Sequence, residues 1–322
     1  MQNPSLPSNI LSILLKDRTT GKNILWATDN YRRYGAAYES DRQILSELIS
    51  RDNGIIIRPR VEKSKAEQQK RVRQKAEVFT PSWVCNLQNN CVEEQWFEQK
   101  EVFNIETDKS WQTITQPVTF PDDPHKTWQD YVRLNVLEIT CGEAPYLTSR
   151  YDTVTGEPIE VPNRIGLLDR KLRIISENTE TAEDWLIWAT VALQCTYGFE
   201  WQGDNILIAR ENLFYDVQEH FAARFADTIP LERQESFAKI ISWNVWQMDG
   251  LKFVIPNSCH IEEQKTDEVY LFEGIFDEEP AQDMCRGCKS GNRLLHNGIY
   301  CKIKDWKINK TLRFVDMLSG NH

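Results

Sequence analysis

Cysteine and histidine residues gather in one stretch of this 322-residue chain, and their spacing is typical of a metal site. Cys285 and Cys288 form a C-x-x-C pair with a glycine inside, a turn that presents two thiolates as tetrahedral zinc requires. We predict a structural zinc site made by Cys285, Cys288, Cys301 and a fourth ligand, with Cys259 as first candidate and His260 and His296 as alternates. The alternative is a set of reduced thiols without metal. A redox role is disfavoured, because this C-x-x-C does not follow a strand in a thioredoxin-like pattern.

Acidic residues stand where predicted strands end, and there a carboxylate can bind a ribose. Apolar residues over 134–139 predict a strand that carries Glu138 and then turns at Cys141 and Gly142. Residues 196–201 predict a second strand, in which Glu200 stands near the end. One such carboxylate can accept hydrogen bonds from both vicinal ribose hydroxyls, so Glu200 is a candidate ligand of an adenosine. The alternative interpretation is a strand-end Glu in a surface ion pair.

Helices are expected to follow and precede these strands. Thr181 to Asp184 has the spacing of a capping box, and apolar residues recur at helical spacing behind it. After the second strand, Asp204 is placed to cap a long helix. The apolar face of that helix contains Ile206, Ala209, Leu213, Val217 and Phe221. Strand, terminal acid, turn and helix form the kind of unit that holds an adenosine ribose.

Four ordered segments resemble the adenine-N6 class of bacterial DNA methyltransferases. They are E-V-F-T-P at 77–81, the segment from Glu138 to Leu147, Y-G-F-E at 197–200 and D-G-L at 249–251. The resemblance implies a Rossmann-like α/β methyltransferase core that binds S-adenosylmethionine, with Glu200 on the ribose and Asp249 on the adenine amine. For Asp249 and Gly250 a plain Asp-Gly turn is the alternative. The implied cofactor-binding residues are Phe79, Thr80, Pro81, Glu138, Cys141, Gly142, Glu200, Trp201, Asp249 and Gly250.

The second segment departs from the family pattern at two positions of its glycine turn. Thr140 stands where a small alanine is usual, and Ala144 replaces the second glycine. We expect Ala144 to have a negative φ, since alanine avoids the left-handed region. The loop that faces the methionine end of the cofactor is therefore expected to differ in shape from that of the family.

The base-binding tetrapeptide of the family, N/D/S-P-P-Y/F/W, does not occur in this sequence. Asp305 and Trp306 are weak candidates for an acid and a stacking aromatic in its place, and the catalytic residues are otherwise unassigned. The chain is also similar to short bacterial proteins described as restriction endonuclease subunit M. Two hypotheses follow: a DNA adenine-N6 methyltransferase subunit whose base-binding loop comes from a partner, or a non-catalytic cofactor-binding or DNA-recognition subunit of a restriction or phage-defence complex. A nicotinamide oxidoreductase is disfavoured because G-x-G-x-x-G is missing.

Composition and charge indicate which partners, membrane or DNA, the chain can be expected to bind. The sequence has no apolar run long enough for a membrane span and no secretory signal, so a cytoplasmic protein is expected. The net charge of -10 does not favour DNA binding, but basic residues crowd the segment 63–75. This segment could follow a phosphate backbone. The alternative is a surface helix with Glu62, Glu67 and Glu77 as counterions.

The chain is expected to have three parts around an α/β core. Residues 1–74 form an N-terminal extension with a helical pattern near 42–49, residues 75–256 form the cofactor-binding core, and residues 257–322 form the small zinc-binding segment. Within the core, 151–180 is interpreted as an insertion and 107–125 as irregular loops. A further strand is predicted over 313–318.

Overall fold

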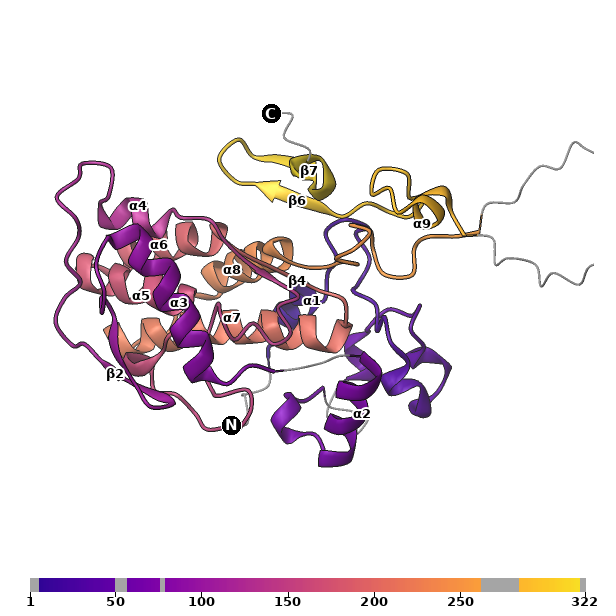
Figure 1. Ribbon diagram of the computed structural model, residues 1–322, viewed down its shortest axis with the longest axis horizontal. Helices are drawn as coiled ribbons and strands as arrows, with labels where there is room; N and C mark the ends of the chain where they lie inside the picture. The colour runs from indigo at the N-terminus through magenta and orange to yellow at the C-terminus, as the bar shows by residue number, and fades with distance from the viewer. Residues whose placement is uncertain (1–5, 50–56, 76–78, 262–283, 319–322) are drawn as a thin grey trace, which may run out of the picture. The chain divides into compact units, whose positions relative to one another are not determined.

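The computed structural model describes residues 6–49, 57–75, 79–261 and 284–318 (Figure 1). It divides the chain into two compact units, Met1–Gln247 and Met248–His322. The domain boundaries predicted from the sequence lie after residues 74 and 256 instead. Thus the N-terminal part shares a unit with the core, and the second unit begins within the segment that contains Asp249.

A parallel three-stranded sheet forms the centre of the first unit. Its strands are β3 (Val136–Ile139), β4 (Thr196–Glu200) and β5 (Val245–Gln247), in that spatial order. Leu137 aligns with Tyr197, and Phe199 aligns with Trp246. Helices separate consecutive strands, as parallel connections require. The expected mixed α/β fold is confirmed at this level, and the carboxyl ends of all three strands meet at one edge.

Helices cover this sheet and extend the core. Those around the strands are α5 (Leu167–Asn178), α6 (Ala182–Gln194), α7 (Gly203–Phe225) and α8 (Leu231–Asn244). The Thr181 side chain accepts a hydrogen bond from the Asp184 amide at 3.1 Å, as the capping pattern predicted. All five apolar positions predicted for the long helix are buried. In Figure 1, α7 and α8 run through the middle of the unit, and both contact β4 and β5.

The remaining elements of the first unit are short, apart from α2 and α3. The helices are α1 (Ser8–Leu14), α2 (Lys65–Lys75), α3 (Ser82–Phe97) and α4 (Trp128–Val132), and an antiparallel hairpin joins β1 (Asn104–Thr107) to β2 (Ser110–Thr113). The helical pattern near 42–49 yields only a short 3-10 helix, Ser46–Leu48. Part of the supposed insertion at 151–180 is α5, whose buried residues belong to the core.

The N-terminal segment is held to the sheet by buried polar groups. The Gln247 amide exchanges hydrogen bonds with the backbone of Leu25, through Leu25 N to Gln247 Oε1 and Gln247 Nε2 to Leu25 O, both at 2.8 Å. The fully buried Arg210 guanidinium donates to the carbonyl oxygens of Leu14 and Lys16. Because these partners lie about two hundred residues apart in the chain, the local sequence pattern could not reveal that this segment belongs to the core.

Asp204 does not cap α7 as predicted. The helix begins at Gly203, with Gln202 at the N-cap. Residue 203 must be glycine, because a Cβ there would lie 1.9 Å from the carbonyl oxygen of Leu25. Asp204 is instead 1% exposed in the first turn, where its carboxylate binds Lys63 at 3.2 Å and also Arg71. These two cations of the basic segment therefore belong to a buried ion triad with Asp204 and are not available to a phosphate backbone.

The second unit contains short elements. They are α9 (Arg286–Ser290), an antiparallel hairpin of β6 (Lys302–Asp305) and β7 (Lys310–Arg313), and α10 (Phe314–Met317). The strand predicted over 313–318 is wrong, because the chain turns into α10 after Arg313 and buries Phe314 and Val315. No helix among the residues that the structure describes in either unit has the length and apolar character needed to cross a membrane.

Candidate cofactor site and metal centre

The loop after β3 has an unusual backbone. Thr140, Gly142 and Ala144 all adopt left-handed conformations, with φ of 52°, 55° and 65°. The negative φ predicted for Ala144 is therefore wrong: its amide donates to the Cys141 carbonyl at 2.7 Å, and its methyl group is fully buried. Left-handed Thr and Ala cost free energy, and such conformations persist where the surroundings hold them, often at functional sites.

Glu200 holds this loop at the carboxyl end of the sheet. Its side chain is nearly buried, and Oε2 accepts a hydrogen bond from the Gly142 amide at 3.0 Å. Oε1 accepts from the amides of Trp201 at 2.9 Å and Gln202 at 3.2 Å. The strand-end acid and the glycine turn, 58 residues apart in the chain, are thus brought together.

We expect Glu200→Gln to lower the free energy of unfolding by roughly 1.5–3 kcal/mol, the usual contribution of a hydrogen bond to a charged group. The glutamine side chain has one oxygen that accepts hydrogen bonds and one nitrogen that donates them, so it cannot replace both carboxylate oxygens as acceptors. Urea unfolding would measure the loss, with exposed Glu180→Gln as the matched control. Equal stability of the two variants would show that the carboxylate does not hold the loop.

Phe79 lies against the same glycine. A Cβ at residue 142 would lie 3.7 Å from Cε1 of Phe79, and the Arg60 guanidinium stacks over the ring at 5.2 Å from its centroid. The Thr80 carbonyl accepts from the hydroxyl of Thr153 at 3.0 Å, and Pro81 is the N-cap of α3. Glu77 and Val78 of the E-V-F-T-P motif lie outside the described residues.

Glu138 and Cys141 are buried behind the loop. Glu138 Oε1 accepts a long hydrogen bond of 3.5 Å from the Tyr146 amide, while Oε2 has no hydrogen-bond partner among the described residues. Burial raises the pKa of this carboxyl well above its ordinary value. Burial likewise raises the pKa of the Cys141 thiol, whose sulfur packs against Gly198. The Trp201 indole N–H is bonded to the Ala27 carbonyl at 3.0 Å.

The remaining sequence candidates belong to the second unit and hold turns there. Asp249 Oδ1 accepts from the Leu251 and Lys252 amides at 2.9 and 3.1 Å, around the turn at Gly250. Asp305 Oδ1 accepts from the Lys307 amide at 2.9 Å in the β6–β7 turn. Lys304 Nζ lies 4.5 Å from the ring centroid of Trp306. These contacts give each residue a structural role in its turn.

The second unit also contains a group that could bind a metal such as zinc. Cys259, Cys285, Cys288 and His296 place one ligand atom each within 4.8 Å of one another. His296 Nδ1 lies 3.8, 3.6 and 3.7 Å from the Sγ atoms of the three cysteines, in chain order. Ordinary zinc bond lengths at a tetrahedral centre separate sulfur and nitrogen by about 3.6 Å. The donor set therefore fits the metal in type and spacing.

Local structure fixes these donors. Cys285 is the N-cap of α9, and its sulfur accepts from the Cys288 amide at 3.4 Å. Gly287 is needed, since a Cβ there would lie 2.6 Å from Nδ1 of His296. Burial opposes the Cys285 thiolate, but backbone N–H groups of Asn297 and Cys288 outweigh it and lower the pKa to about 6. A low pKa favours the thiolate form that binds metal.

Two predicted ligands lie outside this group. Cys301 is fully buried, and its backbone bonds to Phe253 and Phe314. His260 pairs through its backbone with the Asn297 side chain, at 3.1 and 2.9 Å. His296, an alternate in the sequence analysis, occupies the fourth position, because the turn after α9 brings it back onto Gly287.

Sequence reasoning missed a buried charge network in the first unit. Asp169, Asp216 and His220 have ligand atoms within 4.8 Å of one another. His220 Nε2 lies 3.1 Å from Asp169 Oδ1, and Arg164 Nη1 lies 2.6 Å from Asp216 Oδ1. The Arg164 guanidinium already supplies positive charge here, so we interpret the group as a structural link between α5 and α7.

This network predicts sensitivity to acid. Burial by itself would raise the pKa of Asp169, but hydrogen bonds from His220 and Asp216 outweigh it and lower the pKa to about 2. Because the folded-state pKa is below the unfolded value of about 3.9, the stabilisation is complete above pH 4 or so and is lost as pH falls toward about 2. We expect roughly 2 kcal/mol of unfolding free energy to be lost over that interval.

Urea titrations at a series of acidic pH values would measure this loss. Asp169→Asn should be less stable near neutral pH and should show a shallower dependence on pH in the acid range, because it lacks the titrating carboxyl. Parallel curves for the two proteins would rule out Asp169 as the source of the acid sensitivity.

No protein-family model, curated protein or solved structure matches this chain.

Proposed function

We propose that the first unit binds S-adenosylmethionine at the carboxyl edge of its parallel sheet. The observation that carries the proposal is the convergence of Phe79, the left-handed loop at 140–144 and Glu200 at that edge. Ligands of open α/β sheets bind outside the carboxyl ends of the strands. A loop without a phosphate-binding glycine pattern suits this cofactor, which has no phosphate.

The acidic side chains at this edge support a cationic ligand with a ribose. The cofactor carries a sulfonium and an ammonium group, and Glu200 is an acid at this edge. Burial raises the pKa of the nearby Glu138 carboxyl, and a bound cation would favour its charged form. Glu138 Oε2 is buried without a hydrogen-bond partner among the described residues, which suits a site that a donor completes. The ribose hydroxyls would share the Glu200 carboxylate with the amides of Gly142, Trp201 and Gln202.

We assign the reaction as methyl transfer to the N6 amine of adenine in DNA, within a restriction-modification system. In this reaction the amine nitrogen attacks the cofactor's methyl carbon, the carbon–sulfur bond breaks, and S-adenosylhomocysteine leaves as the adenine loses a proton. The base must be flipped out of the duplex, and residues that bind its edge and stack on its face are needed. Asp305 and Trp306 serve the β6–β7 turn, so a partner polypeptide is the proposed source of the base-binding loop.

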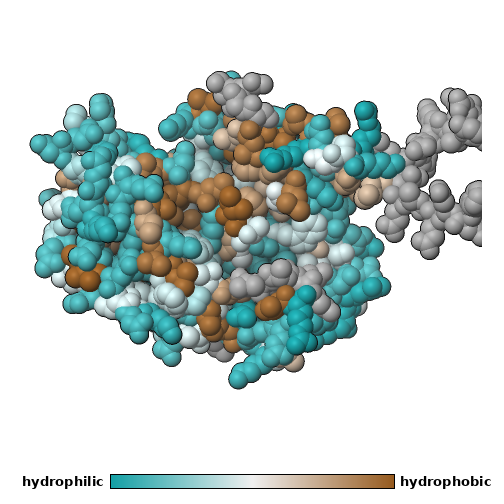
Figure 2. All heavy atoms as spheres, viewed as in Figure 1, coloured by the Kyte–Doolittle hydropathy of each residue, from teal (hydrophilic) through white to brown (hydrophobic). Residues whose placement is uncertain are grey.

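The sheet surface beside β3 supports such a partner. Leu137 and Ile139 are 43% and 67% exposed, on one face of the edge strand. Parallel sheets are usually covered on both faces, so exposed apolar residues here suit the packing of another chain. Figure 2 shows hydrophobic residues at the surface near the place where Figure 1 labels α8 and β4.

A second candidate is a non-catalytic cofactor-binding or DNA-recognition subunit of a restriction or defence complex. The missing tetrapeptide favours it. Under either function the metal group would be structural, because all four positions of a tetrahedral centre would be filled by protein.

Transfer of a tritiated methyl group from the cofactor to unmethylated bacteriophage DNA tests the reaction. The assay uses the chain alone and then with the products of neighbouring genes. Label in N6-methyladenine, identified by nucleoside chromatography, supports the enzyme. If cofactor binds but no combination transfers label, the non-catalytic candidate replaces it.

A further inference from the structure

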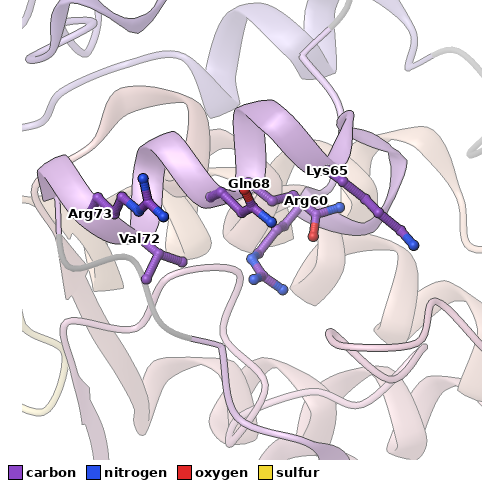
Figure 3. Close-up of a pocket in the computed structure, with 6 residues that line it drawn as sticks. Arg60, Lys65, Gln68, Val72 and Arg73 are labelled. Carbon is purple, nitrogen blue, oxygen red and sulfur yellow. The ribbon is translucent and has the colours of Figure 1, made fainter.

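A cation-lined cavity lies beside α2, outside the residues assigned to the cofactor. Its volume is about 350 Å³, and it is lined by Arg60, Lys65, Gln68, Gln69, Val72 and Arg73. Figure 3 shows Arg60 and Val72 on the same side of the helix. The lining thus offers three positive charges and two amides but no acid, in a chain whose net charge is -10.

The three cations are not neutralised within the described part of the chain. Lys63 and Arg71 of the same segment form the buried triad with Asp204. Arg60, Lys65 and Arg73, in contrast, form no salt bridge with any residue that the structure describes, and the buried Nε of Arg60 has no hydrogen-bond partner there. Like charges gathered around one cavity repel each other, and an anion would relieve that repulsion.

Arg60 connects this cavity to the proposed methyl-donor edge. Its guanidinium stacks over Phe79, and its backbone amide donates to Glu143 Oε1 at 2.6 Å. Glu143 lies within the left-handed loop between Gly142 and Ala144. An anion held by Arg60 would therefore lie near the site where a target base must arrive.

We propose that this cavity binds a backbone phosphate of DNA and so positions the strand beside the cofactor edge. The inference rests on the proposed function for its choice of DNA. Arginine and lysine around an open cavity suit a phosphodiester, which is contacted without regard to sequence. The site thus orients the substrate, and base recognition belongs to other residues.

Fluorescence anisotropy with a labelled duplex of about 20 base pairs tests the site in the full chain, at several salt concentrations. The test variant combines Arg60→Gln, Lys65→Gln and Arg73→Gln. Removing one cation that neutralises a phosphate reduces the slope of log affinity against log salt by about 0.9, so the triple variant should lose up to roughly 2.7 from the slope. We expect at least a tenfold or so weaker binding at low salt. The matched control is Lys239→Gln on α8, an exposed lysine away from the cavity, which should bind as the wild type does.

Calorimetric titration with S-adenosylmethionine separates this inference from the proposed function. It uses the wild type and the double variant Lys65→Gln, Arg73→Gln, which leaves the Arg60 guanidinium in place over Phe79. Cofactor binding retained in the double variant, with DNA binding reduced, supports the phosphate site. If the wild type does not bind the cofactor but the triple variant still loses DNA binding, the phosphate site is supported and the proposed function is contradicted. Equal DNA affinity and salt slope in wild type and triple variant, or binding of inorganic phosphate without binding of the duplex, overturns the inference.

Discussion

Replacing Asp204 with Asn is expected to lower the free energy of unfolding by about 3–5 kcal/mol, because it leaves two buried cations without their counterion. The side chains of Lys63 and Arg71 are 4% and 2% exposed, and that of Asp204 is 1% exposed. These two charges, together with burial, set the pKa of Asp204: burial opposes the charged form, but the cations outweigh it and hold the pKa well below its ordinary range. The Tyr31 hydroxyl donates a further hydrogen bond to the carboxylate at 3.1 Å.

Urea unfolding measures this effect, with Asp108→Asn at an exposed turn as the matched control. The control should change stability by no more than about 0.5 kcal/mol. Adding Arg71→Met to Asp204→Asn should restore part of the loss, since one uncompensated charge is removed. If Asp204→Asn is as stable as the control Asp108→Asn, Asp204 does not pair with Lys63 and Arg71.

Loss of the metal group is expected to unfold the second unit. A structural zinc contributes on the order of 10 kcal/mol to small domains, more than the core of so small a unit supplies. We expect one zinc per chain by elemental mass spectrometry, and its loss in Cys285→Ser and in His296→Ala. Hydrogen exchange over residues 284–318 should rise sharply in these variants and after chelation.

Cys301 supplies the discriminating control for this prediction. Cys301→Ala should retain the metal, although it removes a thiol from the core and costs some stability. Metal loss in Cys301→Ala with retention in His296→Ala would contradict the assigned ligand set. A metal-free wild-type protein, purified without chelator and unable to take up added zinc, would contradict the metal group altogether.

Much of the α/β core could be predicted from local patterns. The Thr181 cap, the strand predicted over 196–201 and the apolar face of α7 depend on residues near each other in sequence. Each is confirmed, although the strand ends one residue earlier, at Glu200. The strand predicted over 313–318 failed because its apolar residues suit a short buried helix equally well. Short apolar runs do not distinguish the two structures.

Long-range partners account for the other differences. Asp204 fits a cap by local spacing, but the cations at 63 and 71 and the approach of Leu25 to Gly203 give it another role. Ala144 was expected to avoid positive φ, yet burial and the contacts of its loop hold it there. For the metal group, all four ligands were among the candidates predicted from the sequence. The sequence spacing could not show that His296, and not Cys301, is the fourth ligand, because His296 reaches the group through a tertiary contact with Gly287.

The most direct test of the central proposal is a calorimetric titration of the whole chain with S-adenosylmethionine. We expect saturable binding of one cofactor molecule per chain, and weaker binding by Phe79→Ala, which removes the ring that lies against Gly142. Absence of binding at millimolar cofactor would contradict the methyl-donor site, and with it the proposed methyl transfer and a cofactor-binding role.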